Sequence, residues 1–155
     1  MVLGTGFGFG HFPVAPGTVG SLWGVLLAWG LRQSGWPLWE QLLVIAVVFL
    51  IGIPICGRAA RLLGTEDPGQ VVFDEIAAMP VVFLVIPSEL PLSIPTGIAG
   101  FLWFRLFDIA KPWPVKWFDQ IEGGLGIMAD DIAAAIYAAG ALWLTVWGLT
   151  FLGVA

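Results

Sequence analysis

Long apolar runs alternate with short polar segments along almost the whole chain. About five apolar segments can be recognised, covering residues 21–31, 37–57, 71–86, 92–107 and 128–152. Each predicts a helix. The first is short for a membrane-crossing helix, which needs roughly 20 residues, so we expect it to tilt, to end at the interface or to re-enter. Pro80 predicts a kink in the third segment.

Composition turns this pattern into a membrane prediction. Hydrophobic residues make up 59% of the 155 residues and charged residues only 11%, with a mean hydropathy of +0.95. An ordinary soluble domain is about 25% charged. The chain has too little polar surface to cover a globule, so we expect lipid to solvate much of it. We predict one all-α domain over residues 1–155, an integral, polytopic membrane helical bundle with about four to five membrane segments.

Basic residues predict the orientation of this bundle. Most of them follow the second and fourth apolar segments: Arg58, Arg61, Arg105, Lys111 and Lys116. Only Arg32 falls on the other side if the segments alternate in direction. The positive-inside rule therefore places the N-terminal loop and the loops 58–70 and 108–129 in the cytoplasm. The loop 87–95 and the C-terminus are expected to face outward.

Carboxylates gather on the same predicted cytoplasmic face. They are Glu66, Asp67, Asp74, Glu75, Asp108, Asp119, Glu122, Asp130 and Asp131, whereas Glu40 and Glu89 lie elsewhere. Asp130 and Asp131 could simply cap the last helix. Capping does not explain why Asp74 and Glu75 repeat the pattern. Because ionisable groups at membrane depth are usually functional, a shared polar site is favoured over capping alone.

Several helix ends that each donate one inward carboxylate would form an oxygen-rich site. Adjacent carboxylates project about 100° apart on a helix, so one acid of the pair Asp130–Asp131 is expected to cap the helix while the other faces the bundle. Such a site suits Mg²⁺, which accepts one or two carboxylates together with water and substrate phosphate. The predicted metal ligands are Asp74, Glu75, Asp130 and Asp131.

The segment FRLFDIAKPWPVKWFDQ, residues 104–120, supplies cations beside these acids. Arg105 and Asp108 are three residues apart and can share a helix face. For Lys116 and the tryptophans, a basic–aromatic anchor at the membrane interface is favoured. For Arg105 and Lys111, phosphate binding is favoured, because it would let a chain of net charge −5 accept an anionic substrate.

The segment FPVAPGTVGS, residues 12–21, combines a turn with the start of the first helix. Thr18 or Ser21 could cap that helix, and equally Thr18 and the Gly17 backbone could donate to a phosphate at its N-terminus. His11, the only histidine, is expected to be structural more often than catalytic. No cleavable signal peptide is evident, since a basic region and a compact apolar region are both missing.

Other function classes lack their motifs. The negative net charge argues against a nucleic-acid partner, which would need a basic stripe. The single cysteine, Cys56, excludes an internal disulfide and a thiolate metal cage. GTGFGFG does not fit the dinucleotide fingerprint. The patterns of aspartyl-phosphate phosphatases, histidine-based lipid phosphatases and CDP-alcohol transferases are absent, and C-x4-R is one residue short of the cysteine-phosphatase loop.

Four blocks of sequence together resemble the phosphatidylglycerophosphatase A family of bacterial inner membranes. They are PGTVGS, DPGQVVFDE, FRLFDIAKPWP and GGLGIMADDIAAAIYA, in the family's order, and they cover most of the chain between Thr5 and Ala138. The resemblance implies Mg²⁺-dependent hydrolysis of phosphatidylglycerophosphate to phosphatidylglycerol and phosphate. It also implies a phospholipid substrate in the bilayer, a multi-pass protein of the bacterial inner membrane and an active site that faces the cytoplasm.

The resemblance further implies the site residues. Those that match the family's motifs are Pro16, Gly17, Thr18, Asp74, Glu75, Arg105, Asp108, Lys111, Pro112, Gly123, Gly124, Gly126, Asp130 and Asp131. In the working mechanism the four metal-binding acids also supply the base for the attacking water, while both cations and Thr18 hold the phosphoryl oxygens. Asp108 orients Arg105 or binds metal. A covalent aspartyl-phosphate stays an alternative. Phe73, where the family pattern predicts Trp, and the missing glycine after Asp-Glu are departures that concern packing.

Two readings from other classes stay open. A small ion-coupled transporter would use the acids to relay protons or bind cations, which predicts acids at mid-bilayer depth and often an internal repeat. Here the acids gather at one face and the sequence shows no repeat. A non-catalytic membrane subunit would need only capped helices. The sequence leaves the oligomeric state undetermined.

Overall fold

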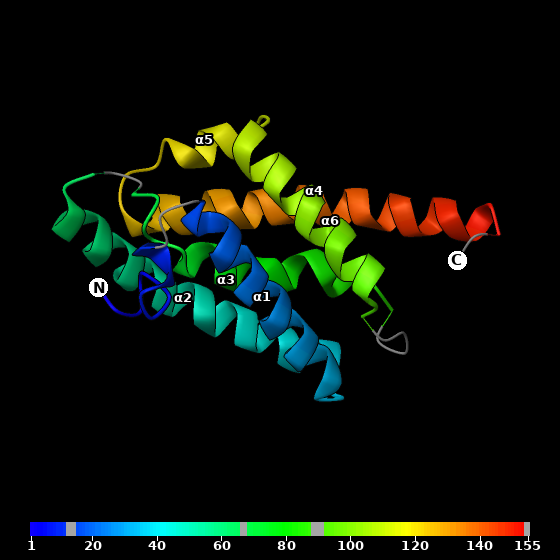
Figure 1. Ribbon diagram of the computed structural model, residues 1–155. Coiled ribbons are helices and arrows are strands. Elements are labelled where there is room, and N and C mark those ends of the chain that lie inside the picture. Colours follow the sequence, from blue (N-terminus) through cyan, green and yellow to red (C-terminus); the bar gives the residue numbers. More distant parts are fainter. Residues whose placement is uncertain (12–14, 66–67, 88–91, 154–155) are drawn as a thin grey trace.

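The computed structural model describes residues 1–11, 15–65, 68–87 and 92–153, and the regular structure within them is entirely helical (Figure 1). The elements are η1 Phe9–His11, α1 Pro16–Gln33, α2 Leu38–Leu63, α3 Phe73–Val82, η2 Phe83–Val85, α4 Ile94–Ala110, α5 Val115–Asp119 and α6 Gly124–Phe151. The predicted all-α fold is confirmed. The side chain of His11 and residues Glu66, Asp67 and Glu89 lie outside the described part.

Helices α1, α2, α3, α4 and α6 alternate in direction. One end of the bundle therefore gathers the N-termini of α1, α3 and α6 and the C-termini of α2 and α4. Gly17 of α1 lies against Arg105 near the end of α4, and Gly57 near the end of α2 lies against Gly124 at the start of α6. At the opposite end, Arg32 Nη1 donates to a backbone carbonyl after η2 at 2.8 Å. The orientation argument assumed this alternation.

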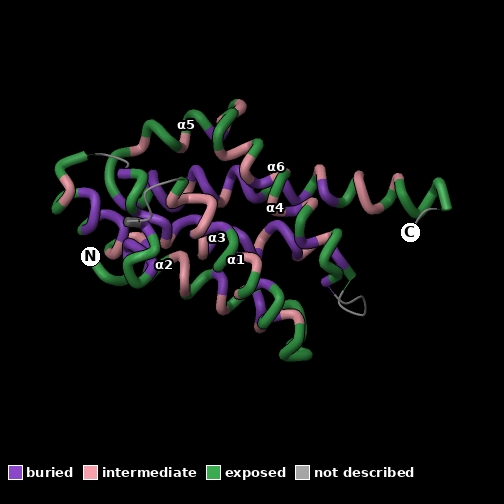
Figure 2. The backbone as a smooth tube through the Cα atoms, in the orientation of Figure 1, coloured by how far each residue is buried: buried purple, intermediate pink, exposed green. Residues whose placement is uncertain are grey.

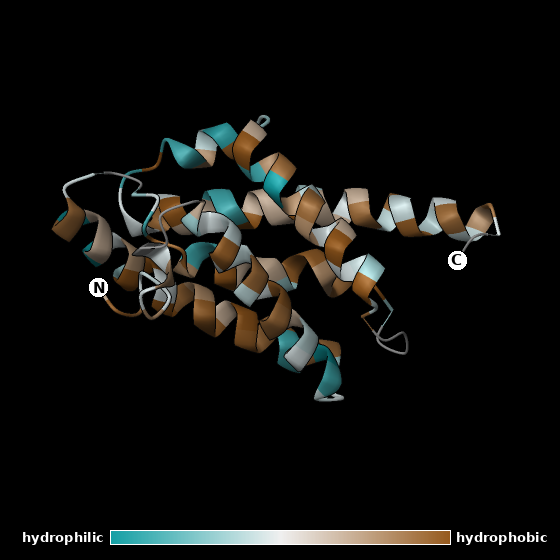
Figure 3. Ribbon diagram, viewed as in Figure 1, coloured by the Kyte–Doolittle hydropathy of each residue, from teal (hydrophilic) through white to brown (hydrophobic). Residues whose placement is uncertain are grey.

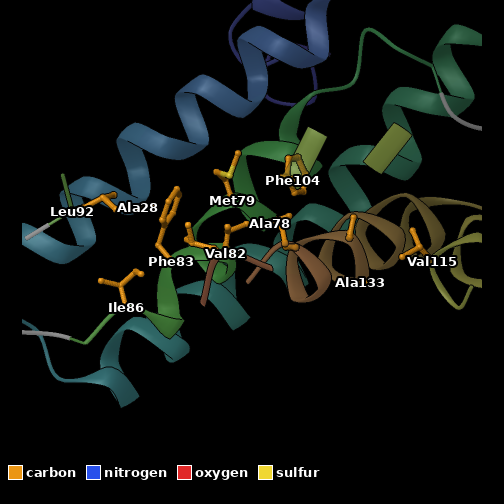
Figure 4. Close-up of a cluster of buried hydrophobic side chains, with 14 residues drawn as sticks. Ala28, Ala78, Met79, Val82, Phe83, Ile86, Leu92, Phe104, Val115 and Ala133 are labelled. Carbon is orange, nitrogen blue, oxygen red and sulfur yellow. The ribbon is translucent and has the colours of Figure 1, made fainter. Parts of the chain in front are cut away.

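Helix α3 is the buried centre of the bundle. Seven of its ten residues are buried, including Met79 and Val82, and Figure 2 shows the helix surrounded by more exposed elements. Its side chains meet those of α1, α4 and α6 in one apolar cluster, where Phe83 and Phe104 are fully buried (Figure 4). Pro80 is tolerated near the end of α3, just before the chain tightens into the 3-10 turn η2.

Small residues let α2 and α6 cross closely. A Cβ on Gly124 would lie 1.8 Å from the carbonyl oxygen of Ile53, and a Cβ on Gly57 would lie 3.0 Å from the backbone nitrogen of Gly124. Further along α6 the alanines 133–135 are buried against neighbouring helices. Small side chains permit such close backbone approach. The N-terminal half of α6 is therefore fixed inside the bundle.

Within the described residues, two helices are long and apolar enough to cross a membrane, α2 and α6. This is fewer than the four to five predicted. Helix α1 has 18 residues, but polar residues occupy both of its ends, Thr18 and Ser21 in the first half and Arg32 and Gln33 at the end. Helix α4 has 17 residues, and α3 has only 10, about 15 Å of length. Apolar runs that also include loop residues overstated the helix lengths.

Between the two ends of the bundle, the outward side of the helices is largely apolar (Figure 3). Leu50, Ile98 and Leu102 are each more than half exposed. The C-terminal half of α6 projects beyond the other helices (Figure 1), and Trp143, Trp147 and Phe151 stack along it. An apolar surface of this extent is expected to contact lipid or protein rather than water.

Candidate active site

Four carboxylates are buried at the end of the bundle that was predicted to carry the site. Asp74, Glu75, Asp130 and Asp131 are each between 4% and 9% exposed. They come from the first turn of α3 and from α6, which pack against each other at the centre of the fold. Acids are almost never buried to this degree without partners. The site is therefore defined by what surrounds these four side chains.

Arg105 joins α3 to α4 at one side of the site. Its Nη1 contacts Glu75 Oε1 at 2.9 Å and Asp108 Oδ2 at 2.8 Å. Asp108 lies one turn after Arg105 on α4, as the three-residue spacing predicts. We name these three residues the arginine cluster. All three side chains are no more than 20% exposed.

Helix α1 closes over the arginine cluster with glycine and serine. A Cβ on Gly17 would lie 2.1 Å from Glu75 Oε1 and 3.0 Å from Arg105 Nη1, and a Cβ on Gly20 would lie 2.6 Å from Glu75 Oε2. Ser21 Oγ lies 3.2 Å from Glu75 Oε2 and 2.9 Å from the Gly17 carbonyl oxygen, and its single O–H is shared between these two acceptors. The PGTVGS block thus lets a backbone approach a buried carboxylate closely and hold it.

Lys111 joins α4, α5 and α6 at the other side of the site. Its Nζ contacts Asp130 Oδ2 at 2.7 Å and also contacts Asp119 Oδ1. Partial burial lowers the pKa of the Lys111 ammonium, but hydrogen bonds and charge attraction from Asp119 and Asp130 outweigh it and raise the pKa above its ordinary value. We name these three residues the lysine cluster. It is more open than the arginine cluster, because Asp119 is 35% exposed.

The backbone at Lys111 is unusual for a lysine. This residue ends α4 with φ 40° and ψ 59°, a left-handed conformation that normally favours glycine. Pro112 follows and prevents the helix from continuing. Tyr137 Oη of α6 donates to the carbonyl oxygen of Trp113 at 2.9 Å, which fastens the PWP segment to the bundle. A strained residue that carries a charged side chain into a buried cluster is a candidate functional residue.

Asp130 and Asp131 lie well inside α6, which corrects the capping prediction. The helix begins at Gly124, its N-cap is Gly123, and neither acid falls in the first turn. Asp131 is 4% exposed, and its Oδ2 has no hydrogen-bond partner among the described residues. The nearby acids that act on it electrostatically are Asp74, Asp108, Asp130 and Glu75. Asp131 is therefore a buried acid with one carboxylate oxygen that is not hydrogen-bonded to any described residue.

The prediction that Thr18 or Ser21 caps the first helix is also wrong. Helix α1 begins at Pro16, and its N-cap residue is Ala15, which has a φ of 49°. Within the described residues, no side-chain hydroxyl caps the helix. Ser21 is inside the helix and contacts Glu75 instead. Thr18 is partly buried in the first turn of α1, next to Gly17.

A pre-formed metal cage is not evident in the described part of the chain, where no three His, Cys, Asp or Glu side chains are grouped closely enough to hold an ion. Beside Asp130 lies a polar cavity of about 240 Å³, whose lining includes Asp119, Glu122 and the backbone of Gly123. Oxygen ligands and an unpartnered buried carboxylate fit an ion that keeps its waters, such as Mg²⁺. A fully dehydrating site would need more ligands.

The structure brings the predicted site residues Gly17, Asp74, Glu75, Arg105, Asp108, Lys111, Asp130 and Asp131 together at one end of the bundle. Two contacts were missed. Ser21 follows Gly17 by four residues, a spacing that places both on one helix face and could have indicated the contact. Asp119 reaches Lys111 only because α5 folds back over α6, and no local signal indicates this.

Fold and site together define a class of protein: an apolar helical bundle that carries buried acids and clustered cations at one end. The family can be named from the sequence. The chain belongs to the phosphatidylglycerophosphatase A family, whose model matches residues 2–146, and it is thus a member of a phosphatase family.

Relatives with curated names support this membership. Phosphatidylglycerophosphatase A of Escherichia coli strain K12 is 37% identical over 143 residues, which cover 92% of this chain and 80% of the relative. The protein of the same name from Haemophilus influenzae is 42% identical over 138 residues, 88% of this chain and 82% of the relative. A Bacteroides thetaiotaomicron protein with the provisional name phosphatidylinositol-3-phosphatase is 34% identical over 142 residues, 89% of this chain and 87% of the relative. No solved structure is significantly similar to the chain.

Proposed function

We propose that this protein hydrolyses the terminal phosphomonoester of phosphatidylglycerophosphate to give phosphatidylglycerol and inorganic phosphate. The observation that carries the proposal is the group of four buried carboxylates flanked by the arginine and lysine clusters. Two relatives carry this activity in their names. The relative named for another lipid phosphate supports a lipid phosphomonoester as the substrate class.

Arg105 and Lys111 hold the phosphoryl oxygens in this proposal. Both contacts that Arg105 makes within the described residues use Nη1, whereas a guanidinium carries five N–H donors, so others can reach a phosphate. The side chain of Lys111 is 24% exposed, and Asp119 and Asp130, the two acids that it contacts, line the polar cavity. Their positive charge would stabilise the charge that develops on the phosphoryl oxygens in the transition state.

Of Asp74, Asp130 and Asp131, one or two would bind a Mg²⁺ ion that keeps its waters, because no three acids among the described residues are grouped closely enough to hold an ion by themselves. A bound Mg²⁺ would polarise the phosphoryl group and offset its negative charge. Glu75 is assigned to Arg105 instead, because its two carboxylate oxygens already contact Arg105 and Ser21. This assignment narrows the four predicted ligands to three candidates. One carboxylate of this group would accept a proton from the attacking water as the water oxygen bonds to phosphorus and the bond to the glycerol oxygen breaks. The glycerol oxygen then takes up a proton from that carboxylic acid or from water.

The bundle is proposed to cross the bacterial inner membrane several times with the site facing the cytoplasm. Exposed Arg58 and Arg61 lie on the last turns of α2, at the same end as the site, while Arg32 lies at the opposite end. This distribution of cations fits the positive-inside rule. A site at the interface would let the phosphate head enter while the acyl chains stay in lipid.

The proposal is tested by phosphate release from phosphatidylglycerophosphate in lipid nanodiscs, with Mg²⁺, with EDTA and after Mg²⁺ is restored. We expect Asp130→Asn and Asp74→Asn to lower the rate at least about a thousandfold while both proteins still fold. Glu40→Gln is the matched control, because Glu40 lies in the first turn of α2 at the opposite end of the bundle. Its rate should equal that of the wild type.

A second readout separates metal binding from catalysis. Mg²⁺ should raise the thermal unfolding midpoint of the wild type and of Glu40→Gln, but not of Asp131→Asn. Full Mg²⁺-dependent activity in both Asp130→Asn and Asp74→Asn would overturn the proposed site. Proton-coupled ion flux without phosphate release would favour the transporter instead.

A further inference from the structure

Helices α1 and α4 run antiparallel with a register that two close approaches define. At the site end, a Cβ on Gly17 would lie 3.0 Å from Arg105 Nη1. Eight residues after Gly17 on α1 and eight residues before Arg105 on α4, a Cβ on Gly97 would lie 3.8 Å from Val25 Cγ1. The two contacts are about 12 Å apart along the helix axes. The same two helices therefore border the site and the apolar region behind it.

Each helix carries one continuous face that changes from polar to apolar along this register. On α1, Leu22 follows Thr18 by four residues, and Val25 and Trp29 continue the same face at helical spacing. On α4, the matching face runs from Ile94 through Gly97 and Phe101. It then reaches Arg105 four residues later and Asp108 three residues after that. The polar ends of both faces are the proposed phosphate-binding end.

An apolar groove of about 380 Å³ occupies the space between these two faces. It is lined from Leu22 to Trp29 on α1 and from Leu92 to Phe101 on α4 and the residues before it, with Ser93 as the polar member of the lining. Several lining side chains are also half exposed on the outer surface, Leu22 and Ile98 among them. The groove is thus open to the bundle's surroundings along its side and begins within one turn of the site.

We infer that this groove between α1 and α4 binds an acyl chain of the lipid phosphomonoester, with the phosphate directed toward Arg105. The inference rests on the proposed function and adds where the lipid lies and between which helices it enters. The observation that selects this occupant is continuity, because the apolar lining and the cationic end belong to the same two helix faces. A chain of methylene groups gains free energy in proportion to the apolar area it buries there.

A second apolar groove, of about 440 Å³, does not share this continuity. It lies on the other side of α1, between the N-terminal residues, Trp23 and Phe73. Val72 is fully buried and closes it from Glu75, since Cβ atoms on Gly6 and Gly20 would lie 2.9 Å and 2.7 Å from Val72 side-chain atoms. This groove therefore provides an internal comparison for the experiment.

The first experiment fills the groove and compares two substrates. Gly97→Leu adds a side chain toward the groove, and the nearest described atom to its Cβ would be at ordinary contact distance, so α4 should still fold. Gly30→Leu on α1 is the matched control, because a Cβ there would meet no described atom within 4 Å and Gly30 does not line the groove. The substrates are dioleoyl phosphatidylglycerophosphate and its deacylated headgroup.

We expect Gly97→Leu to raise KM for the dioleoyl lipid about tenfold, as expected from losing contact with about two methylene groups, and to leave kcat almost unchanged. Hydrolysis of the deacylated headgroup should be unaffected, and Gly30→Leu should match the wild type on both substrates. Equal losses on both substrates, or no change on the lipid, would overturn the inference.

The second experiment does not depend on turnover, so it separates this inference from the proposed function. The full-length protein in nanodiscs is photolabelled with a phosphatidylglycerophosphate that carries a diazirine on one acyl chain. Labelling should fall on Leu22, Val25 and Trp29 and within residues 92–101. Trp23, Leu26 and Leu27 are not diagnostic, because they line the second groove. Unlabelled substrate should compete the labelling away. Labelling by a diazirine phosphatidylcholine to the same extent would show ordinary lipid contact only. That result, or labelling concentrated at residues 1–9 beside the second groove, would overturn the inference, even if the protein hydrolyses the lipid. Groove labelling without phosphate release would leave the inference standing and overturn the function.

Discussion

The arginine and lysine clusters are built on the same plan and placed in different surroundings. In each, one cation is held between two carboxylates, and α4 supplies the cation in both. Arg105 is enclosed by α1 and α3, where the backbone at Gly17 leaves no space around Glu75. Lys111 leaves α4 in a left-handed conformation and reaches α5 and α6 beside a polar cavity.

Because their surroundings differ, we expect the two cations to have different roles in phosphate binding. A guanidinium packed between two acids, a glycine and a serine has a fixed position, which suits a donor that orients a phosphoryl group. An ammonium on a flexible stem at the edge of a cavity can follow a phosphate as it enters or leaves. The arginine cluster should therefore be sensitive to small steric changes, and the lysine cluster to loss of charge.

Among changes that leave the four buried carboxylates in place, the largest effect should come from a single methyl group at Gly17. In Gly17→Ala the new Cβ would lie 2.1 Å from Glu75 Oε1, so the carboxylate and Arg105 must move. We expect kcat/KM for phosphatidylglycerophosphate to fall about a hundredfold, because a displacement of about 1 Å at a positioning residue has effects of that size. Gly30→Ala, in open space on the same helix, should keep full activity and unfold at a slightly higher temperature. Wild-type kinetics in Gly17→Ala would show that the arginine cluster is not part of the site.

Loss of the ammonium should have the next largest effect. In Lys111→Met the stem of the side chain is kept, but Asp119 and Asp130 lose their shared cation. We expect kcat/KM to fall about 30-fold, equivalent to about 2 kcal/mol of transition-state stabilisation. Lys111→Arg, which keeps the charge, should recover part of it. If Lys111→Arg were as inactive as Lys111→Met, a positive charge alone would not be sufficient, and the position of the lysine ammonium would be required as well.

The same pair of proteins tests the raised pKa of Lys111. A raised folded-state pKa means that the ion pairs contribute their full stability below the ordinary lysine value of about 10.4 and lose it only as pH rises through the folded value. The difference in unfolding free energy between wild type and Lys111→Met should stay constant from about pH 7 to about pH 9.5. A difference that shrinks across that range would mean that burial outweighs the two carboxylates.

The sequence predicts these clusters to different extents. Arg105 and Asp108 could be paired in advance because both lie on one helix at a three-residue spacing, and the structure confirms the pair. The end at which they lie followed from alternating helices and the basic loops. The pairing of Lys111 with Asp119 could not be predicted from the sequence, because it depends on how the PWP segment turns α5 back onto α6.

The acids at the start of α6 show why a helix boundary matters. The apolar pattern predicts that the last helix starts at Met128, within GGLGIMADD, and a helix that starts there would have Asp130 and Asp131 as caps. The helix in fact starts at Gly124, because Gly123 adopts a φ of 78° and Gly124 must approach the carbonyl oxygen of Ile53. Close helix contact, which no apolar periodicity reports, carries both acids almost two turns into the bundle.

A smaller effect is expected when Ser21 no longer holds Glu75. Ser21→Ala removes one hydrogen bond of 3.2 Å to Glu75 Oε2 but adds no atom, so the arginine cluster should loosen and stay assembled. We expect kcat to fall about fivefold with KM little changed, in line with about 1 kcal/mol for one such bond. Ser34→Ala at the opposite end removes a comparable hydrogen bond, to the Leu31 carbonyl oxygen, and should leave kcat unchanged. Ser21→Thr, which keeps the hydroxyl, should restore most of the rate if positioning is the role.

The smallest effect should come from Asp119, and it sharpens the comparison within the lysine cluster. Asp119 and Asp130 contact the same ammonium, but Asp119 is 35% exposed and Asp130 only 6%. Exposed ion pairs contribute about 0–1 kcal/mol, so Asp119→Asn should change kcat/KM no more than about twofold. Asp130→Asn should abolish activity if that acid acts on the metal or the phosphate as well as on Lys111. Equal losses in the two variants would mean that both acids serve only to hold the lysine, and the catalytic carboxylates would then have to be sought on α3 and at Asp131.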